Sequence, residues 1–282
     1  MRQQLRPTRL LLLGALFAVI LRGASAQSET DAAALARAHA HNDYEHARPL
    51  LDALDRGFSS VEVDVWLADG RLLVAHDREA IRSDRTLESL YLDPLRDRVR
   101  QHGGRVQPNG PEFLLWIDVK SEAEATYAVL GSTLTAYADM VTTFSADGVL
   151  PKGVRVIVSG NRARDTMARE PVRFAAIDGR LLDLDSQASS ALIPFVSDNW
   201  QLQFQWRGVG PFPPEERAKL IGLVSRAHEQ RRKIRFWAIP DQREGWQECL
   251  DAGVDLINTD DLEGLRQFLL GNPARSIRVL LP

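Results

Sequence analysis

The sequence predicts an α/β fold, a single (β/α)8 barrel with a β-hairpin after its second strand. Short apolar runs alternate with longer amphipathic runs along most of the 282 residues, which is typical of βαβ units and a parallel sheet. Several apolar runs are continuous in Val, Ile, Leu and Phe, as expected for strands that are buried on both faces. Eight such runs in one domain of about 250 residues favour a closed barrel of the TIM type. An open doubly wound sheet is the alternative.

The barrel strands are expected where the apolar runs are shortest and most continuous. They are predicted at residues 35–40, 60–66, 113–119, 154–159, 173–177, 192–197, 234–239 and 254–258. A further short strand at 71–75 follows Asp69-Gly70, and Asp-Gly between apolar runs is a strong hairpin signal. The hairpin is expected to return His76 across the mouth of the barrel.

Helices are expected in most of the gaps between these strands. They are predicted at residues 48–56, 122–137, 162–170, 214–231, 244–252 and 262–270. Gly57 is placed to end the first of them. Pro213 and Pro214 precede two glutamates, which is a favourable helix start with acidic residues in the first turn.

The N-terminal segment has the pattern of a cleavable secretory signal peptide. Three arginines within the first nine residues precede an apolar run at 10–21, and the small residues Ala24-Ser25-Ala26 follow. The apolar run is shorter than the ~20 residues that span a bilayer. We therefore expect a signal peptide at 1–26, a barrel domain at 27–282, and export to the periplasm or the exterior. An uncleaved N-terminal anchor is the alternative.

The charge of the mature chain argues against nucleic acid as a partner. Removal of residues 1–26 lowers the count of Lys and Arg from 35 to 31, against 38 Asp and Glu, for a net charge of about −7. Binding to nucleic acid depends on neutralisation of phosphates by basic residues. Cys249 is the single cysteine, so no internal disulfide forms and a buried, inert thiol is expected.

A pair of carboxylates lies inside the second apolar strand. Glu62 and Asp64 are two residues apart, so both side chains point to the same face of the strand. Burial of two carboxylates is costly unless something compensates their charge. A divalent cation would do so, and oxygen ligands suit Mg²⁺ or Ca²⁺. The alternative is that both carboxylates pair with Lys120 or a nearby arginine.

The polar residues along the chain resemble those of glycerophosphodiester phosphodiesterases and their phospholipase-D toxin relatives. The matching segments, in order, are His41, Gly57, Val61-Glu62-Val63-Asp64-Val65, His76-Asp77, Ile117-Asp118-Val119-Lys120, Phe236-Trp237-Ala238-Ile239 and residues 252–260. The opening His-Ala-His-Asn-Asp-Tyr is most similar to the altered-inheritance-of-mitochondria protein 6-like group. The resemblance covers almost the whole mature chain.

The resemblance implies a site of catalytic, metal-binding and substrate-binding side chains. It assigns His41 and His76 as the catalytic pair, Glu62, Asp64 and Asp118 as ligands of one Mg²⁺ or Ca²⁺, Lys120 as a catalytic cation near the phosphate, and Trp237 as an aromatic beside the substrate. Asn42 and His39, next to His41, are further candidates for substrate binding. The substrate implied is a small-molecule or lipid phosphodiester. The usual His-Arg-Gly start is absent, His39 is a second candidate for the first histidine, and the spacing from His41 to Glu62 is nearer to the toxin-like branch. These departures leave the substrate class open.

Phosphodiester hydrolysis fits these residue types on chemical grounds. A cation and Lys120 stabilise the charge that develops on the phosphate oxygens. His41 and His76 can act as general base and general acid on opposite sides of phosphorus, with their order unassigned. Attack by a substrate hydroxyl, which gives a cyclic phosphate, and direct attack by a histidine are both left open.

Three further interpretations of the sequence remain open. His39-Ala40-His41 also resembles the opening of zinc amidohydrolase barrels, although zinc prefers more nitrogen and sulfur ligands than the chain offers. A barrel that binds a lipid or a phosphate without turnover is the non-enzymatic alternative. Asp260 either orients a catalytic histidine or caps the final helix, and we favour the cap.

The loop after the sixth strand is rich in aromatic residues. Trp200 and Trp206 lie in it, with Phe204 and Phe212. Amphipathic rings on the active-site face suit a lipid tail or peripheral membrane contact. Packing of the loop against the barrel is the alternative that we favour. The oligomeric state is not predicted.

Overall fold

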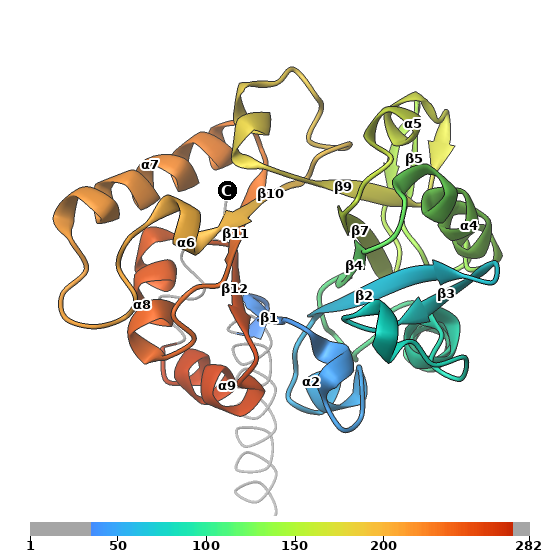
Figure 1. Cartoon of the computed structure of the whole chain (residues 1–282), viewed down its shortest axis with the longest axis horizontal. Coiled ribbons are helices and arrows are strands. Elements are labelled where there is room, and N and C mark those ends of the chain that lie inside the picture. The colour runs from blue at the N-terminus through green and yellow to red at the C-terminus, as the bar shows by residue number, and fades with distance from the viewer. Residues whose placement is uncertain (1–34, 273–282) are drawn as a thin grey trace, which may run out of the picture.

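The computed structural model describes residues 35–272, and the expected signal peptide lies outside this range. Eight parallel strands form a closed barrel (Figure 1). They are β1 (Ala38–Ala40), β2 (Ser60–Ala68), β4 (Phe113–Val119), β7 (Val154–Gly160), β9 (Ala175–Gly179), β10 (Phe195–Asn199), β11 (Lys233–Trp237) and β12 (Leu256–Thr259). The barrel closes because β1 pairs with β12 and also with β2, where Ala40 lies opposite Val61. The predicted fold class is confirmed.

The predicted hairpin is also present. Strand β3 (Arg71–Val74) runs antiparallel to β2, and the turn between them is formed by Asp69 and Gly70. Both turn residues have positive φ, 50° and 71°, as a two-residue hairpin of this type requires. The hairpin extends to one side of the barrel in Figure 1 and brings His76 towards the carboxylates of β2.

Helices surround the barrel on its outer side (Figure 1). They are α2 (Leu51–Asp55), α3 (Asp93–Gln101), α4 (Ala123–Ala136), α5 (Arg164–Arg169), the short α6 (Trp200–Gln203), α7 (Pro214–Glu229), α8 (Arg243–Ala252) and α9 (Leu262–Leu270). Shorter turns are η1 (Asp43–Glu45), η2 (Arg78–Ala80), the π-helical η3 (Glu88–Leu92) and η4 (Leu181–Asp185). The link from β9 to β10 contains η4 in place of an α-helix. Between residues 35 and 272, no helix has the length and apolar content needed to cross a membrane.

Two parts of the chain differ from the sequence prediction. The strand expected at 173–177 is divided: β8 (Val172–Arg173) joins β5 (Thr143–Ser145) and β6 (Gly148–Leu150) in a separate antiparallel sheet, and β9 enters the barrel. Helix α3 was not expected. Its nine residues include three arginines and two aspartates, and it buries only Leu95 and Val99.

Apolar and acidic side chains alternate along β2 and point to opposite faces of the strand. Val61, Val63 and Val65 belong to the large core between the strands and the helices. Glu62 and Asp64 alternate with them and therefore point into the barrel. A small apolar cluster around Trp116 fills the barrel interior, and Glu62 lies beside Trp116 in the pairing of β2 with β4. The polar residues of the site lie above this apolar plug.

Candidate active site

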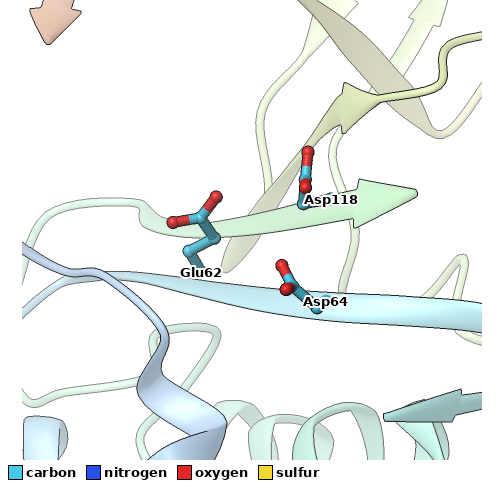
Figure 2. Close-up of side chains that lie close together, drawn as sticks. All are labelled: Glu62, Asp64 and Asp118. Carbon is cyan, nitrogen blue, oxygen red and sulfur yellow. The ribbon is translucent and has the colours of Figure 1, made fainter. Parts of the chain in front are cut away.

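Three carboxylates converge at the mouth of the barrel (Figure 2). Asp118 of β4 lies beside Asp64 of β2 in the strand register, and Glu62 is two residues earlier on the same face. One carboxylate oxygen from each residue lies within 4.8 Å of the other two. Glu62 is 6% exposed and Asp64 is 1% exposed. Burial raises the pKa of Glu62, against the opposing charges of Arg235 and His41, and burial likewise raises the pKa of Asp64.

The carboxylates fit a hard divalent cation. The Oε2 of Glu62 is buried and has no hydrogen-bond donor among the described residues, although an ionised carboxylate oxygen needs a partner. Three closely spaced carboxylate oxygens are the ligands that Mg²⁺ and Ca²⁺ prefer. Within the described part of the chain, this cluster can therefore hold a metal, and its identity is not fixed by the donor set.

Lys120 lies next to the same carboxylates. Its Nζ contacts Oδ2 of Asp118 and lies 3.1 Å from Oδ2 of Asp64. Burial lowers the pKa of Lys120, but the charges of Asp118 and Asp64 outweigh it and the pKa is raised. The alternative from the sequence, in which Glu62 and Asp64 pair with Lys120 or a nearby arginine, thus describes Asp64. Glu62 has weaker partners, His41 at 3.5 Å and Arg235 at 3.9 Å.

His41 is held between two acidic residues. Its Nδ1 lies 3.0 Å from Oδ1 of Asp260, and its Nε2 lies 3.5 Å from Oε2 of Glu62. Burial lowers the pKa of His41, but the hydrogen bond to Asp260 and the charge of Glu62 outweigh burial, so the pKa is raised. The preferred interpretation of Asp260 as a helix cap was wrong: the neighbouring Asp261 caps α9 by accepting from the N–H of Gly264.

His76 is held by Asp64 and Tyr44. The Nδ1 of His76 lies 3.0 Å from Oδ2 of Asp64. The hydroxyl of Tyr44 donates to the same Oδ2 at 2.7 Å and lies 3.0 Å from the Nδ1 of His76. It also lies 3.1 Å from Oδ1 of Asn42. Tyr44 was missed as a site residue, although it stands in the segment whose His-Ala-His-Asn-Asp-Tyr pattern was noted.

A pocket of about 260 Å³ unites these groups. It is lined by His41, Asn42, Glu62, Asp64, His76, Asp118, Lys120, Ser159, Gly160, Arg180, Arg235 and Trp237. The structure therefore brings together the predicted catalytic and metal-binding residues, with Asn42 and Trp237. His39, Trp200 and Trp206 do not line it.

Two arginines in the pocket were missed by sequence reasoning. Arg235 is buried and its guanidinium lies 4.1 Å from the centre of the Trp116 ring. Arg180 stacks 4.8 Å from the ring centre of Trp237 and donates to Oδ2 of Asp178 at 2.7 Å. Arg235 had a signal in the sequence, because it lies two residues before Trp237 on the same face of a buried strand.

A buried hydrogen-bond network lies beneath the pocket and includes His39. The ring of His39 is 0% exposed, with Nδ1 at 2.7 Å from Oγ of Ser60 and Nε2 at 2.5 Å from Nη1 of Arg235. Burial and Arg235 keep its pKa well below the usual range, so the ring is neutral and Nε2 accepts from the guanidinium. The Nε of Arg235 donates to Oγ of Ser197, and this hydroxyl donates to Oδ1 of Asp178. His39 is placed to support Arg235 and has no direct access to the pocket.

The aromatic loop packs inward. Trp200 is 0% exposed and Trp206 is 7% exposed. Trp200 stacks 5.7 Å from the ring centre of Phe212, and its Nε1 donates to the carbonyl of Trp206. The loop thus has the arrangement of the packing alternative, and contact of these two rings with lipid stays an untested prediction.

A family model and several proteins of other organisms are similar to this chain. A family model described as an AIM6-like phosphodiesterase domain matches residues 28–175. The altered inheritance of mitochondria protein 6 of Eremothecium gossypii is 29% identical over 283 residues, which span 88% of this chain and 73% of that protein. Its namesake in Saccharomyces cerevisiae is 30% identical over 276 residues, spanning 79% and 68%. A homolog from Arthroderma benhamiae is 26% identical and spans 82% of each chain.

One solved structure is also similar in outline. The glycerophosphodiester phosphodiesterase from Agrobacterium tumefaciens aligns over 82% of this chain and 98% of its own, with 15% identity and a TM-score of 0.49.

Proposed function

The chain belongs to the AIM6-like phosphodiesterase family, and from this premise we propose that it hydrolyses a glycerophosphodiester or phospholipid-type diester. The observation that supports this most is the composition of the 260 Å³ pocket, where three carboxylates face three cationic side chains and two histidines. A phosphodiester needs positive groups around its non-bridging oxygens and proton-transfer groups beside its bridging oxygens.

The cationic side chains bind and orient the phosphate. Lys120, Arg180 and Arg235 line the pocket, and each is held by a carboxylate, a serine or an aromatic ring before substrate arrives. Such preorganised charges stabilise the charge that grows on the phosphate in the transition state. Glu62, Asp64 and Asp118 would hold one Mg²⁺ or Ca²⁺, and this cation supplies further positive charge at the phosphate oxygens.

Each catalytic histidine has one ring nitrogen fixed and one left for proton transfer. The Nδ1 of His41 faces Asp260, and the Nδ1 of His76 faces Asp64. These carboxylates fix the ring orientation and favour the tautomer in which Nδ1 carries hydrogen. The Nε2 atoms then exchange protons with the attacking and the leaving oxygen. Because His41 is held by Asp260 after β12 and His76 by Asp64 on β2, we assign the two rings to the two different bridging oxygens of the phosphate.

A metal-dependence assay tests this proposal. The purified chain is given bis-(p-nitrophenyl) phosphate with and without EDTA, and then with Mg²⁺ or Ca²⁺ restored. Glu62→Ala and His76→Ala are measured beside Glu229→Ala, an exposed carboxylate at the end of α7 that serves as the matched control. We expect activity to disappear with EDTA and in both site variants, and to persist in the control.

Other outcomes would favour the rival functions. Activity that only Zn²⁺ restores would favour a zinc amidohydrolase-like enzyme. Absence of turnover with any metal, together with tight binding of a diester, would favour a binding protein without catalysis.

We also propose that the chain is exported, on the basis of its first 26 residues alone. Expression of the full chain with a C-terminal tag, followed by cell fractionation and N-terminal sequencing, tests this. Cleavage near Ala26 supports export, and an intact N-terminus in the cytoplasmic fraction contradicts it.

A further inference from the structure

The connection from β1 to α2 contains a strained turn at Leu50. The N–H of Leu51 donates to the carbonyl of Pro49 at 2.7 Å, and Leu50 between them has φ 64° and ψ −49°. These angles are close to those of the γ-turn with positive φ, which is rare and strained in a residue that carries a side chain. A conformation of this cost persists only where other contacts hold it in place.

The carboxylate of Asp43 holds this turn. Its Oδ2 accepts from the N–H of Leu50 at 2.5 Å and from the hydroxyl of Tyr91 at 2.8 Å. Asp43 is 0% exposed, and its Oδ1 has no hydrogen-bond donor among the described residues. Burial raises the pKa of Asp43 to about 6 in spite of both hydrogen bonds. Two costly features, a strained backbone and a buried carboxylate, therefore meet in one contact.

The same carboxylate lies beside side chains of the active site. Asp43 is the first residue of η1 and Tyr44 is the second. The hydroxyl of Tyr44 donates to Oδ2 of Asp64 at 2.7 Å and lies 3.0 Å from Nδ1 of His76. A displacement of η1 therefore moves the hydroxyl that contacts both side chains. Local features that cost stability are expected where they serve a functional site.

We propose that Asp43 is a positioning residue of the active site: by accepting from the N–H of Leu50 it fixes η1, and η1 places the hydroxyl of Tyr44. This inference rests on the proposed function, in which Asp64 binds the cation, and adds to it a residue that contacts neither cation nor substrate. Asp43 does not line the 260 Å³ pocket, so its effect passes through its neighbour in the turn.

A second contact holds η1 at the next residue. The Nη2 of Arg85 donates to the carbonyl of Tyr44 at 2.6 Å. This contact leaves the start of the turn without support, and there Asn42 has the left-handed conformation with φ 47°. Asp43 supplies that support, so the turn is fixed at two successive residues.

Matched variants separate positioning from general stability. Asp43→Ala removes the acceptor, whereas Asp43→Asn keeps an oxygen that can accept from Leu50. Asp43→Leu combined with Tyr91→Phe removes the charge together with the hydroxyl, and replaces Asp43→Ala if that variant does not fold. Asp93→Ala is the control, because it breaks a comparable hydrogen bond from Tyr137 at 2.6 Å between α3 and the end of α4, outside the pocket.

Calorimetric titration with Ca²⁺ or Mg²⁺ and kcat/KM for bis-(p-nitrophenyl) phosphate measure the effect. We expect Asp43→Ala to weaken ion binding and to lower kcat/KM by about tenfold or more, as for other groups behind a metal ligand. Asp43→Asn should stay within about threefold of the unmodified chain, and Asp93→Ala should match it.

A double variant tests the route through Tyr44. In a Tyr44→Phe background, Asp43→Ala should cause less than about a threefold further loss, because the hydroxyl that it positions is already absent. Losses that multiply in the double variant overturn the inference. An unchanged Asp43→Ala, or an equal loss in Asp43→Asn, overturns it as well.

The NMR signals of the His76 ring nitrogens give a readout that needs neither metal nor turnover. In EDTA they should shift in Asp43→Ala and not in Asp43→Asn, because the hydroxyl of Tyr44 lies beside Nδ1. Unchanged signals in Asp43→Ala overturn the inference even where turnover upholds the phosphodiesterase. A shift in Asp43→Ala, in a protein whose unmodified chain neither binds an ion nor turns over, upholds the positioning and rejects the proposed function.

Discussion

The hydroxyl of Tyr44 donates to Oδ2 of Asp64 across 2.7 Å, inside a pocket where Asp64 is almost fully buried. The same oxygen lies 3.0 Å from His76 and 3.1 Å from Lys120. One carboxylate oxygen is thus the common point of a tyrosine, a histidine and a lysine that come from different parts of the barrel. All three side chains therefore depend on this oxygen for one of their polar contacts.

Replacement Tyr44→Phe should weaken the site without disturbing the fold. It removes the hydroxyl that donates to Asp64 and lies 3.0 Å from Nδ1 of His76, and it leaves the ring in the core. Loss of a hydrogen-bond partner behind a metal ligand lowers metal affinity or activity by about 10–100-fold, and we expect kcat/KM to fall within that range. Titration of activity with Mg²⁺ or Ca²⁺ measures the effect. Unchanged metal dependence would show that Tyr44 is only structural, and thermal unfolding of the variant is the control for folding.

Replacement Glu62→Gln should reverse its effect on stability when metal is added. Without divalent ions it removes a buried charge whose Oε2 has no hydrogen-bond donor, so the variant should unfold at a temperature equal to or above that of the unmodified chain. With Mg²⁺ or Ca²⁺ the unmodified chain gains stability by binding the ion, and the order should invert. Thermal unfolding with EDTA and then with each ion measures both. A Tm difference that is insensitive to the ions would contradict a metal at Glu62.

Replacement Asp260→Asn should identify the role of His41. The hydrogen bond to Asp260 helps to raise the pKa of His41, so its removal should lower that pKa. If His41 is the general base, the acidic limb of the kcat/KM profile moves to lower pH; if it is the general acid, the alkaline limb does so. A profile measured from pH 5 to 9 distinguishes the two. If neither limb moves, His41 does not control the rate through its ionisation.

Replacement Asp43→Asn should change how stability depends on pH. Asp43 accepts from the N–H of Leu50 and from the hydroxyl of Tyr91, and burial raises its pKa from 3.8 to about 6. A raised pKa in the folded state stabilises below the unfolded value of 3.8, and this contribution is lost as pH rises through 6. The unmodified chain should therefore lose about 3 kcal/mol relative to the variant between pH 3.5 and pH 7. Urea unfolding at both pH values measures this difference, and a constant difference would refute it.

Replacement Trp200→Ala should destabilise the fold, because the side chain is fully buried among aromatic rings. Removal of a buried tryptophan costs about 3–5 kcal/mol. Denaturant unfolding measures the loss.

The lipid-contact hypothesis predicts that liposome binding falls in Trp206→Ala even where the fold persists. Liposome binding that survives this replacement would reject the hypothesis.

Much of the site follows from strand periodicity, which depends only on local sequence. The spacing of Glu62 and Asp64 placed both on one face, and the strand order of a barrel placed Asp118 next to them. The Asp69-Gly70 turn returned His76 to the same edge. These residues were predictable because backbone geometry alone sets their direction.

Other features depend on contacts that no local pattern encodes. The hydroxyl of Tyr44 reaches Asp64 from the short turn η1, which follows Asn42 in the left-handed conformation with φ 47°. Asp260 and Asp261 are chemically identical, and the end of β12 decides which one meets His41 and which one caps the helix. The small sheet of β5, β6 and β8 has strands of two or three residues, too short for alternation to show.

The buried network beneath the pocket limits how this barrel can change during evolution. Ser60, His39, Arg235, Ser197 and Asp178 come from five strands, and each fills a hydrogen bond of the next. Loss of Arg235 alone would remove the donor to Nε2 of His39 and the donor to Oγ of Ser197 in the interior, so the residues at these positions should covary. Relatives with an apolar residue in place of Arg235 should have replaced His39 as well, and would have drifted to substrates with less negative charge.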